Sequence, residues 1–502
     1  MTEAAGSHPG ARPFRLLIYG LVLASSAAQF AIVPIMPTYA HRFGLSGFQQ
    51  GMVLGATGLA TLAVSVPAGV LSDRFGARRL TLWAGLLMTI ATFAQSLAGD
   101  FPVLLGSRLI FGVGYGVVWT AGLSWIDRTI PTGSGLGASV ASAGAGGVAG
   151  PAAAGALVQC FGLTVPWLAT AAGFALITIG LGLLRMPARP APPTAPMAAS
   201  LRAAAADRNT ICAAAAIVAA GVTTGVSALL VPAQLHAAGA SPGRIGLDFS
   251  IAGVLFVAGS TLTASAGRRA LRKSVICGGM LALAAALSPA ALTAAPLAIV
   301  AMLCLTTAAR SVLWTVSYPL AAEGARHNSA GLGVVVGLLN GIWAATAVLG
   351  PLAAGLAVEH LSPRAVFGLT QAACAAALAA AAVAWRTGHR SRPRDPARSP
   401  SWIAVQLRRF AHQPALPFRQ AHPILTTAAP AKNAPPGPGG TGPARSGRRA
   451  SRRSGRRIRH ALAVNAARAA RRADPRPAAS RARAAHSDHR RPTTARRGSG
   501  RR

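Results

Sequence analysis

The sequence predicts an all-α membrane protein with twelve transmembrane helices in two six-helix repeats, followed by a basic tail. Two features of the composition support this fold class: 52% of the 502 residues are hydrophobic and only 12% are charged, whereas soluble proteins have about 25% charged residues. The third observation is the pattern, because long apolar runs recur throughout residues 14–385. Apolar runs of this kind cross a bilayer as helices.

Each apolar run is predicted to be one helix, because about 20 residues span the hydrocarbon core. The first run follows Arg12 and Arg15 and resembles a signal peptide, but it continues to Pro37, which predicts an uncleaved helix. The twelve predicted spans are residues 14–37, 50–71, 80–98, 101–125, 135–159, 163–184, 209–235, 245–266, 274–293, 296–320, 330–358 and 365–385.

Loop charge predicts how the spans are oriented. If the N-terminus is cytoplasmic, the inside loops contain clusters of Arg and Lys, such as those within residues 74–79 and 268–273. The only arginines in the outside loops are then Arg42, Arg244 and Arg364. Basic residues are enriched in cytoplasmic loops. We therefore expect a multi-pass protein of the inner (cytoplasmic) cell membrane with both termini in the cytoplasm.

Composition also predicts the domain boundaries. A cytoplasmic N-terminus (1–13) precedes one bundle (14–184), and a proline-rich cytoplasmic linker (185–208) separates it from a second bundle (209–385). The halves share short sequences, since "GPAAAG" at 150–155 recurs as "GPLAAG" at 350–355. A duplicated six-helix unit is the organisation of transporters that bind substrate between repeats.

The tail, residues 386–502, is rich in Arg, Pro, Ala and Gly and is predicted to be disordered. Our leading expectation is a solvated tail without a binding role, and the alternative is contact with anionic lipid headgroups or nonspecific contact with nucleic acid. No aromatic residues alternate with the arginines as a stacking platform, so specific nucleic-acid binding is not expected.

The loop between the second and third spans reads "GVLSDRFGARRLTL". It strongly resembles the hallmark loop of the major facilitator superfamily, and a plain basic loop would explain its arginines but not its acid and glycine spacing. The resemblance implies a latch that closes the cytoplasmic side by tying this loop to the eleventh helix near Gly331 and to Asp127. The matching loop residues are Gly69, Asp73, Arg74, Gly76, Arg78 and Arg79.

Span four contains "RLIFGVGYG", residues 108–116, which resembles a second motif of the family. An arginine inside a membrane span is costly and normally faces a cavity or a partner. The resemblance links Arg108 to proton movement or to hydrogen bonds with the first helix, where Gln29 is the expected partner. The alternative is an arginine that reaches the interface with its guanidinium.

Span five resembles the antiporter signature of the family, with Ala154 in place of one glycine. The resemblance favours export, and the alternative is a helix-packing device that carries no information about direction. Its residues are Gly137, Gly146, Gly150, Pro151 and Gly155, and the second repeat matches them with Gly350, Pro351 and Gly355.

The family resemblance also implies that the first, fourth, seventh and tenth helices line a central cavity. Aromatic and polar side chains there suit amphipathic organic compounds. Arg310 is expected to contact an anion or to belong to an internal ion pair. Asn340 and Trp343 are secondary candidates. The cavity candidates are Gln29, Arg108, Tyr115, Trp119, Thr224, Gln234, Arg310, Trp314 and Tyr318.

Function follows from the resemblance as an expectation: a monomeric secondary transporter that exports small organic compounds by alternating access. Proton coupling usually needs an acid deep in the membrane, and every one of the 11 acids falls in a loop, tail or helix end. Organic-anion uptake or facilitated transport stays open, as does a sensor or scaffold that uses the basic tail. Enzyme motifs are missing from the sequence, and neither a metal nor a cofactor is expected.

Overall fold

The computed structural model of the chain describes residues 11–130, 134–184, 202, 204–327 and 332–387, all within the first of its two units, Met1–Gln413. Every element in these ranges is a helix, which confirms the predicted fold class. The predicted tail from residue 388 onward and nearly all of the predicted linker lie outside the described residues.

The first repeat contains six long helices, and the fourth continues through a π-helical turn, η1, and a short helix, α5. These elements are α1 (Ala11–Phe43), α2 (Gly47–Phe75), α3 (Ala77–Ser96), α4 (Phe101–Val117), η1 (Val118–Gly122), α5 (Leu123–Thr129), α6 (Ser134–Phe161) and α7 (Thr164–Leu183).

The second repeat again has six helical spans, the third of which consists of two consecutive helices. Its elements are α9 (Arg208–Ala237), α10 (Pro242–Ser265), the 3-10 turn η2 (Gly267–Leu271), α11 (Lys273–Ala286), α12 (Ser288–Leu292), α13 (Pro296–His327), α14 (Leu332–Val358) and α15 (Pro363–Thr387). Ten helical segments of the described chain are long and apolar enough to cross a membrane, and α2 and α3 complete the twelve predicted spans.

Local sequence explains where several helices begin and turn. Ser46 starts α2 with a capping box, in which its hydroxyl accepts from Gln49 N–H and Gln49 accepts from Ser46 N–H. Asp100 and Ser241 cap α4 and α10 in the same manner, through N–H groups three residues later. Gly76 joins α2 to α3 at φ +91°, a conformation that favours glycine.

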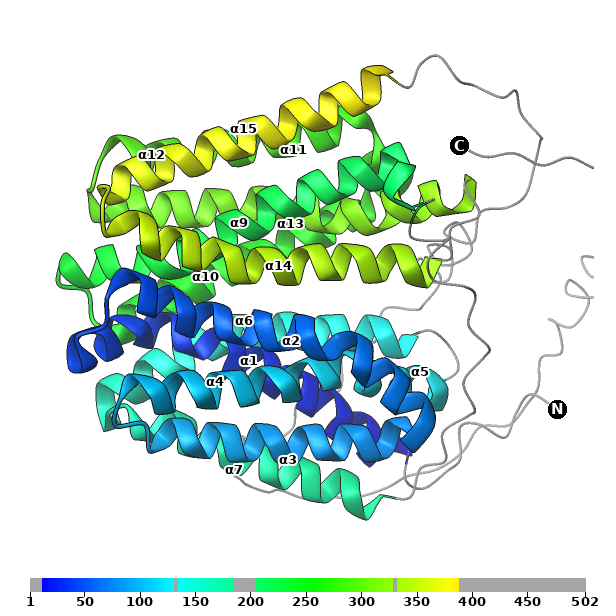
Figure 1. The fold of residues 1–502 in the computed structure, drawn as a ribbon, viewed down its shortest axis with the longest axis vertical. Helices are drawn as coiled ribbons and strands as arrows, with labels where there is room; N and C mark the ends of the chain where they lie inside the picture. The colour runs from blue at the N-terminus through cyan, green and yellow to red at the C-terminus, as the bar shows by residue number, and fades with distance from the viewer. Residues whose placement is uncertain (1–10, 131–133, 185–201, 203, 328–331, 388–502) are drawn as a thin grey trace, which may run out of the picture. The chain divides into compact units, whose positions relative to one another are not determined.

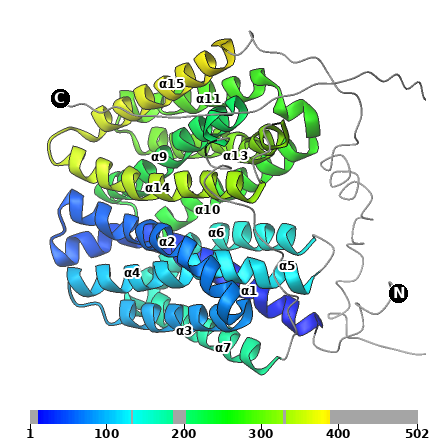
Figure 2. The same ribbon diagram turned by 45° about the vertical axis from the view of Figure 1, so that its right-hand side comes forward.

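Helices of one repeat lie together, with α1–α7 in the lower part of Figure 1 and α9–α15 in the upper part. Between the repeats, α2 packs on α14 and α6 packs on α10, and the view in Figure 2 agrees. Large apolar side chains on the outer surface remain exposed, such as Leu176 at 71% and Leu297 at 80%. A bilayer is the solvent that accommodates such a surface.

Candidate functional site

Glycines bring α2 directly onto the backbone of α14. A methyl group added to Gly51 would lie 2.5 Å from the carbonyl oxygen of Pro351, and one added to Gly58 would lie 3.2 Å from Val348 Cγ2. Gly47 meets Gly355 in the same way at the N-terminal end of α2. We call this contact the α2–α14 joint.

A corresponding contact, the α6–α10 joint, connects the repeats a second time. Gly246 lies against the backbone of Pro151, and Gly155 lies against Pro242. Ser250 accepts from Ala152 N–H at 3.1 Å and donates to the Val148 carbonyl at 2.6 Å. Its hydroxyl therefore bridges two groups that are hydrogen-bond partners in a regular helix, next to the bend-promoting Pro151.

The two joints are internal copies of each other. Pro151 and Pro351 are 200 positions apart, as are Val148 and Val348. Their partners Gly246 and Gly51 are 195 positions apart (246 − 51). The sequence match that predicted duplication thus reappears as matched contacts between the repeats.

The glycines of the antiporter-like motif also hold each repeat together. A methyl group on Gly150 would lie 2.7 Å from Ala27 Cα on α1, and Gly146 lies against Leu23 and Ala27 of the same helix. In the second repeat, Gly225 of α9 lies against Gly350 and Pro351. Gly137 lies in the first turn of α6. These glycines therefore lie where neighbouring helices approach each other closely.

At each joint, a polar side chain from the C-terminal end of a helix in one repeat forms a hydrogen bond with the N-terminus of a helix in the other repeat. Glu359, just after α14, accepts from Phe48 N–H at 2.9 Å at the start of α2. Gln159, near the end of α6, accepts from the hydroxyl of Ser241, the N-cap of α10, at 3.0 Å. We name these two contacts the interbundle caps, and the end of the bundle that holds them the cap end.

The backbone bond from Phe48, and then a bond from Ser46, lower the pKa of the Glu359 carboxyl below its ordinary value. Sequence reasoning missed both interbundle caps. A signal was present, because positions 159 and 359 keep the 200-residue offset and Ser46 and Ser241 both precede a span.

At the opposite end of the bundle, which holds the loop with the family motif, the described residues form no such joint. Nothing within 4 Å surrounds an added methyl group on Gly69, Gly337 or Gly341. No neighbouring helix therefore approaches Gly69 closely in this arrangement. We call this end the loop end.

The residues of the predicted latch do not converge among the described side chains. Arg78 Nη2 donates to the carbonyls of Gly182 and Leu184 at 2.7 and 3.1 Å, at the C-terminal end of α7. Arg74 lies over the Phe75 ring, while Arg79 and Asp127 are exposed. The side chain of Asp73 and the position of Gly331 lie outside what the structure describes, so the latch stays a prediction.

Arg108 is completely buried on α4, and its Nη2 donates to Gln29 Oε1 on α1 at 3.1 Å. Its guanidinium carbon lies 5.2 Å from the centroid of the Phe111 ring. Nε and Nη1 have no hydrogen-bond partner among the described residues. The contact is the one expected from the sequence, and its role in transport stays a prediction.

Two further cavity candidates extend from Arg108 along the same stretch of the chain. The Tyr115 ring lies 6.1 Å from Phe111 and 6.0 Å from Trp119, centroid to centroid. Trp119 belongs to η1, and π-helical turns often occur at functional sites. The sequence did not predict this turn.

Arg310 forms a second polar and aromatic group in the other repeat. Its Nη1 donates to the Thr224 hydroxyl on α9, and its Nη2 donates to Thr307 at 2.7 Å. One turn further along α13, Trp314 lies 5.8 Å from the ring of Trp343 on α14 and 5.6 Å from Tyr318. Thus four of the predicted residues, Thr224, Arg310, Trp314 and Tyr318, lie together with one secondary candidate, Trp343.

The remaining candidate, Gln234, lies apart from this group. It lines a pocket of about 230 Å³ at the cap end, together with Gly47, Gln50 and Val358. The distance along α9 from Thr224 to Gln234 is ten residues, about 15 Å at 1.5 Å per residue.

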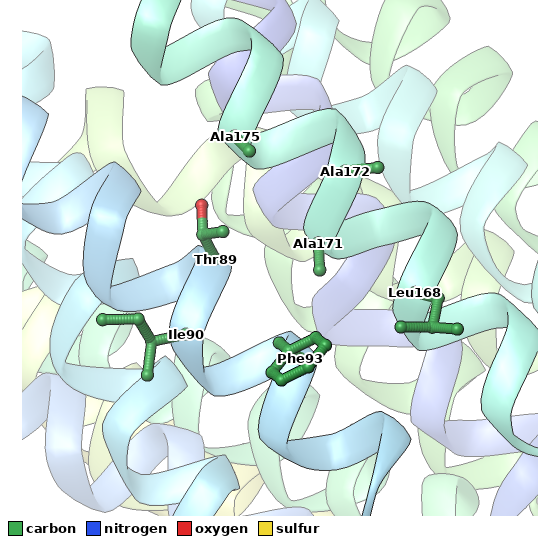
Figure 3. A pocket seen from close by; sticks show the side chains of 7 residues that line it. All are labelled: Thr89, Ile90, Phe93, Leu168, Ala171, Ala172 and Ala175. Carbon is green, nitrogen blue, oxygen red and sulfur yellow. The ribbon is translucent and has the colours of Figure 1, made fainter.

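A larger pocket of about 430 Å³ lies between α3 and α7, away from both arginines, and Figure 3 shows its lining. Ile90 and Phe93 are each 50% exposed there, and the Thr89 hydroxyl is already bonded to the Gly85 carbonyl. An apolar groove on the outer surface of a membrane protein suits lipid chains. None of the predicted site residues lines it.

Comparison with known proteins identifies a family. The sequence model of the Major Facilitator Superfamily matches residues 18–335 and again 211–432. The MFS-type transporter ppzB of Metarhizium majus is 30% identical over 173 residues, which cover 34% of this chain and 36% of the fungal protein. The quinolone resistance protein NorA of Staphylococcus aureus is 29% identical over 87 residues, 17% of this chain and 22% of NorA. The chain spans about a third of the length of the curated fungal relatives it matches.

Solved structures show the same fold. An inward-facing, unoccupied structure of a bacterial homolog of the human lysosomal transporter Spinster has a TM-score of 0.62 at 17% identity, covering 76% of this chain and 98% of that chain. A structure of the nucleoside transporter NupG has a TM-score of 0.59 at 14% identity and covers 74% of this chain and 100% of that chain.

Proposed function

The chain belongs to the major facilitator superfamily, and on that premise we propose that it is a secondary transporter that exports small organic compounds across a cytoplasmic membrane by alternating access. The observation that carries this proposal is the one-ended contact between the repeats. Both joints and both interbundle caps lie at the cap end, while Gly69 and Gly341 have open space around them. Two rigid repeats that meet at one end can rock about a site between them.

Two observations support export as the direction. Gly146, Gly150, Pro151 and Gly155 match the antiporter signature, and a segment of the chain resembles a protein named for quinolone resistance. We place the loop end in the cytoplasm, because this end holds the arginine-rich loop at 74–79 and basic residues are enriched in cytoplasmic loops. With this orientation, the open space around Gly69 and Gly341 supports a cytoplasm-open state.

We also propose that the loop at 69–79 stabilises the opposite, outward-open state, in which the loop end closes. Arg74 and Arg79 are exposed here and free to bind an acid or helix end that approaches when the repeats rock. Contacts of Asp73 and Asp127 with these arginines would then form in the outward-open state.

The test is uptake of compounds into everted membrane vesicles that contain the full chain, because movement into an inside-out vesicle is the export direction, with proteoliposomes as the purified counterpart. A panel of anionic, neutral and cationic aromatic compounds is assayed with and without a protonophore. We expect directional transport of at least one class, and abolition by the protonophore would identify proton coupling. No transport of any compound by stably inserted protein would contradict the proposal and favour the sensor or scaffold.

Two variants extend this assay. Asp73→Asn is expected to slow transport at least tenfold with unchanged expression, whereas the matched change Asp395→Asn in the tail is expected to have no effect. Deletion of residues 390–502 is expected to leave transport intact. Unchanged transport in Asp73→Asn would remove the latch, and loss of transport in the truncated chain would give the tail a role.

A further inference from the structure

We propose that the compounds carried by this protein are amphipathic organic anions, and that Arg310 binds their acidic group while Trp314 and Trp343 contact their apolar part. This inference rests on the proposed function, because it names the substrate class of the same site. It comes from the distribution of charge inside the described helices, from the hydrogen bonds of Arg310 and from the aromatic side chains beside it.

The interior of the helical bundle has an excess of positive charge. Arg108 and Arg310 both lie well inside membrane-spanning helices, and neither forms an ion pair with a described side chain. The most deeply placed acid, Asp248, is 3% exposed and is paired with Arg244 at 3.1 Å. A site for organic cations would require an acid that faces the compound, and the described interior offers none beside either arginine.

The two arginines differ in how accessible they are. Arg108 has no exposed surface and lies between Gln29 and the Phe111 ring. Arg310 is only half-buried, so part of its side chain can be reached. Among the two, Arg310 is therefore the one that a compound can contact without displacement of a packed aromatic ring.

Neutral hydroxyls hold the Arg310 guanidinium but do not neutralise it. The Thr224 hydroxyl donates its own proton to the Ala220 carbonyl at 2.7 Å, so its lone pair faces Nη1. Thr307 occupies Nη2 at 2.7 Å, and Nε has no partner. The Nε atom is itself buried, so the guanidinium charge is held in low dielectric without a counterion. An anionic ligand beside the reachable part of the Arg310 side chain would supply that counterion.

Aromatic side chains continue from this charge along one face of α13. Arg310, Trp314 and Tyr318 are spaced by four residues, which places them on one helical stripe about 12 Å long. Trp343 meets Trp314 edge-to-face, and all of these rings are half-buried. The Tyr318 hydroxyl donates to Asn340 Oδ1 at 2.6 Å at the far end. A compound with an acid at one end and an aromatic body matches this order.

The experiment compares binding of three matched probes to the full chain in nanodiscs by calorimetry: 2-naphthalenesulfonate, 2-naphthamide and 2-naphthylmethylammonium. We expect the sulfonate to bind at least tenfold more tightly than the amide, and the ammonium to bind most weakly. Arg310→Gln is expected to abolish the preference for the sulfonate, while Arg364→Gln, the same change at an exposed helix end, keeps it. Arg310→Lys retains the charge and is expected to keep part of the preference, which covers the case in which the Gln variant does not fold.

Equal affinity of the wild type for sulfonate and amide, or an unchanged ratio in Arg310→Gln, would overturn the inference. Transport of the same three probes separates this result from failure of the proposed function. Directional movement of the amide or ammonium alone would retain the exporter and refute the anion site. Tight, Arg310-dependent binding of the sulfonate without movement of any probe would support the anion site and refute the exporter.

Discussion

Arg78 completes the C-terminal end of α7, where carbonyl groups have no partner within their own helix. Its Nη2 reaches both the Gly182 and the Leu184 carbonyl. Arg78→Ala should therefore lower stability by about 1–2 kcal/mol, since each hydrogen bond contributes roughly 0.5–1.5 kcal/mol. Arg79→Ala removes the same charge from an exposed position next to it and should have little effect.

Thermal unfolding of the two purified variants in one detergent checks this prediction. A lower Tm for Arg78→Ala alone is the expected result. Equal Tm values for both variants would mean that the contact adds nothing measurable to stability.

Single residues were predictable from sequence where a local physical demand identified them. A buried arginine needs an acceptor, so Gln29 could be named as the partner of Arg108, and a turn between two helices needs Gly76. The partner of Arg78 was not predictable, because it depends on where α7 ends relative to α3. Glu359 was missed because it looks like an ordinary loop acid until α2 is placed beside it.

At the scale of single elements, α6 depends on positions that have no side chain. Gly150→Ala would bring a methyl group within 2.7 Å of the Ala27 backbone on α1, and overpacking of this kind costs about 1–3 kcal/mol. Gly341→Ala is the matched control on α14, because open space surrounds it. Alanine there should be neutral or stabilising by about 0.5–1 kcal/mol, since it favours a helix over glycine.

Thermal unfolding of both variants tests this prediction, because the two substitutions are expected to change the Tm differently. We expect the Tm to decrease in Gly150→Ala and not to decrease in Gly341→Ala. If both variants lose stability equally, close approach of the α1 and α6 backbones is not what the glycine provides.

Elements were predicted well where hydrophobic length defined them, because each predicted span coincides over most of its length with one helix or a run of adjacent helices. The extensions at their ends were not predicted. For example, α13 continues to His327, past the predicted end at 320, because polar residues continue a helix once it leaves the apolar layer. The π-helical turn η1 has no local signature in the sequence, since its extra residue is selected by packing.

At the scale of the whole molecule, Glu359 is expected to make the contact between the repeats depend on pH. Its pKa is lowered when it accepts from Phe48 N–H, so the contact is strongest when the carboxylate is ionised and weakens as the pH falls through that pKa. The other interbundle cap uses Gln159, which does not titrate. Acid on the cap side should therefore loosen the α2–α14 joint and leave the α6–α10 joint unchanged.

Hydrogen exchange of residues 47–52, corrected for the intrinsic effect of pH, measures this loosening. Protection in the wild type should fall at acid pH, while Glu359→Gln, which keeps an acceptor oxygen, should show no such fall. The charge of the neighbouring His360 also contributes to the lowered pKa of Glu359, so His360→Gln serves as a control. The same acid-induced loss in Glu359→Gln would assign the effect to a different group.

The glycine surfaces of the two joints also bear on how fast the repeats can rearrange. Interlocked side chains must change rotamer before two helices can slide past each other, and each such change adds to the activation barrier. Gly47, Gly51 and Gly246 present bare backbone to their partners, so movement across them meets few such obstacles. Close packing at the two joints lowers the free energy of the state in which the cap end is closed, and the contact surface contains few protruding side chains. A transporter with these two joints should thus change conformation quickly. Binding or release of the cargo should then be the step that limits its turnover rate.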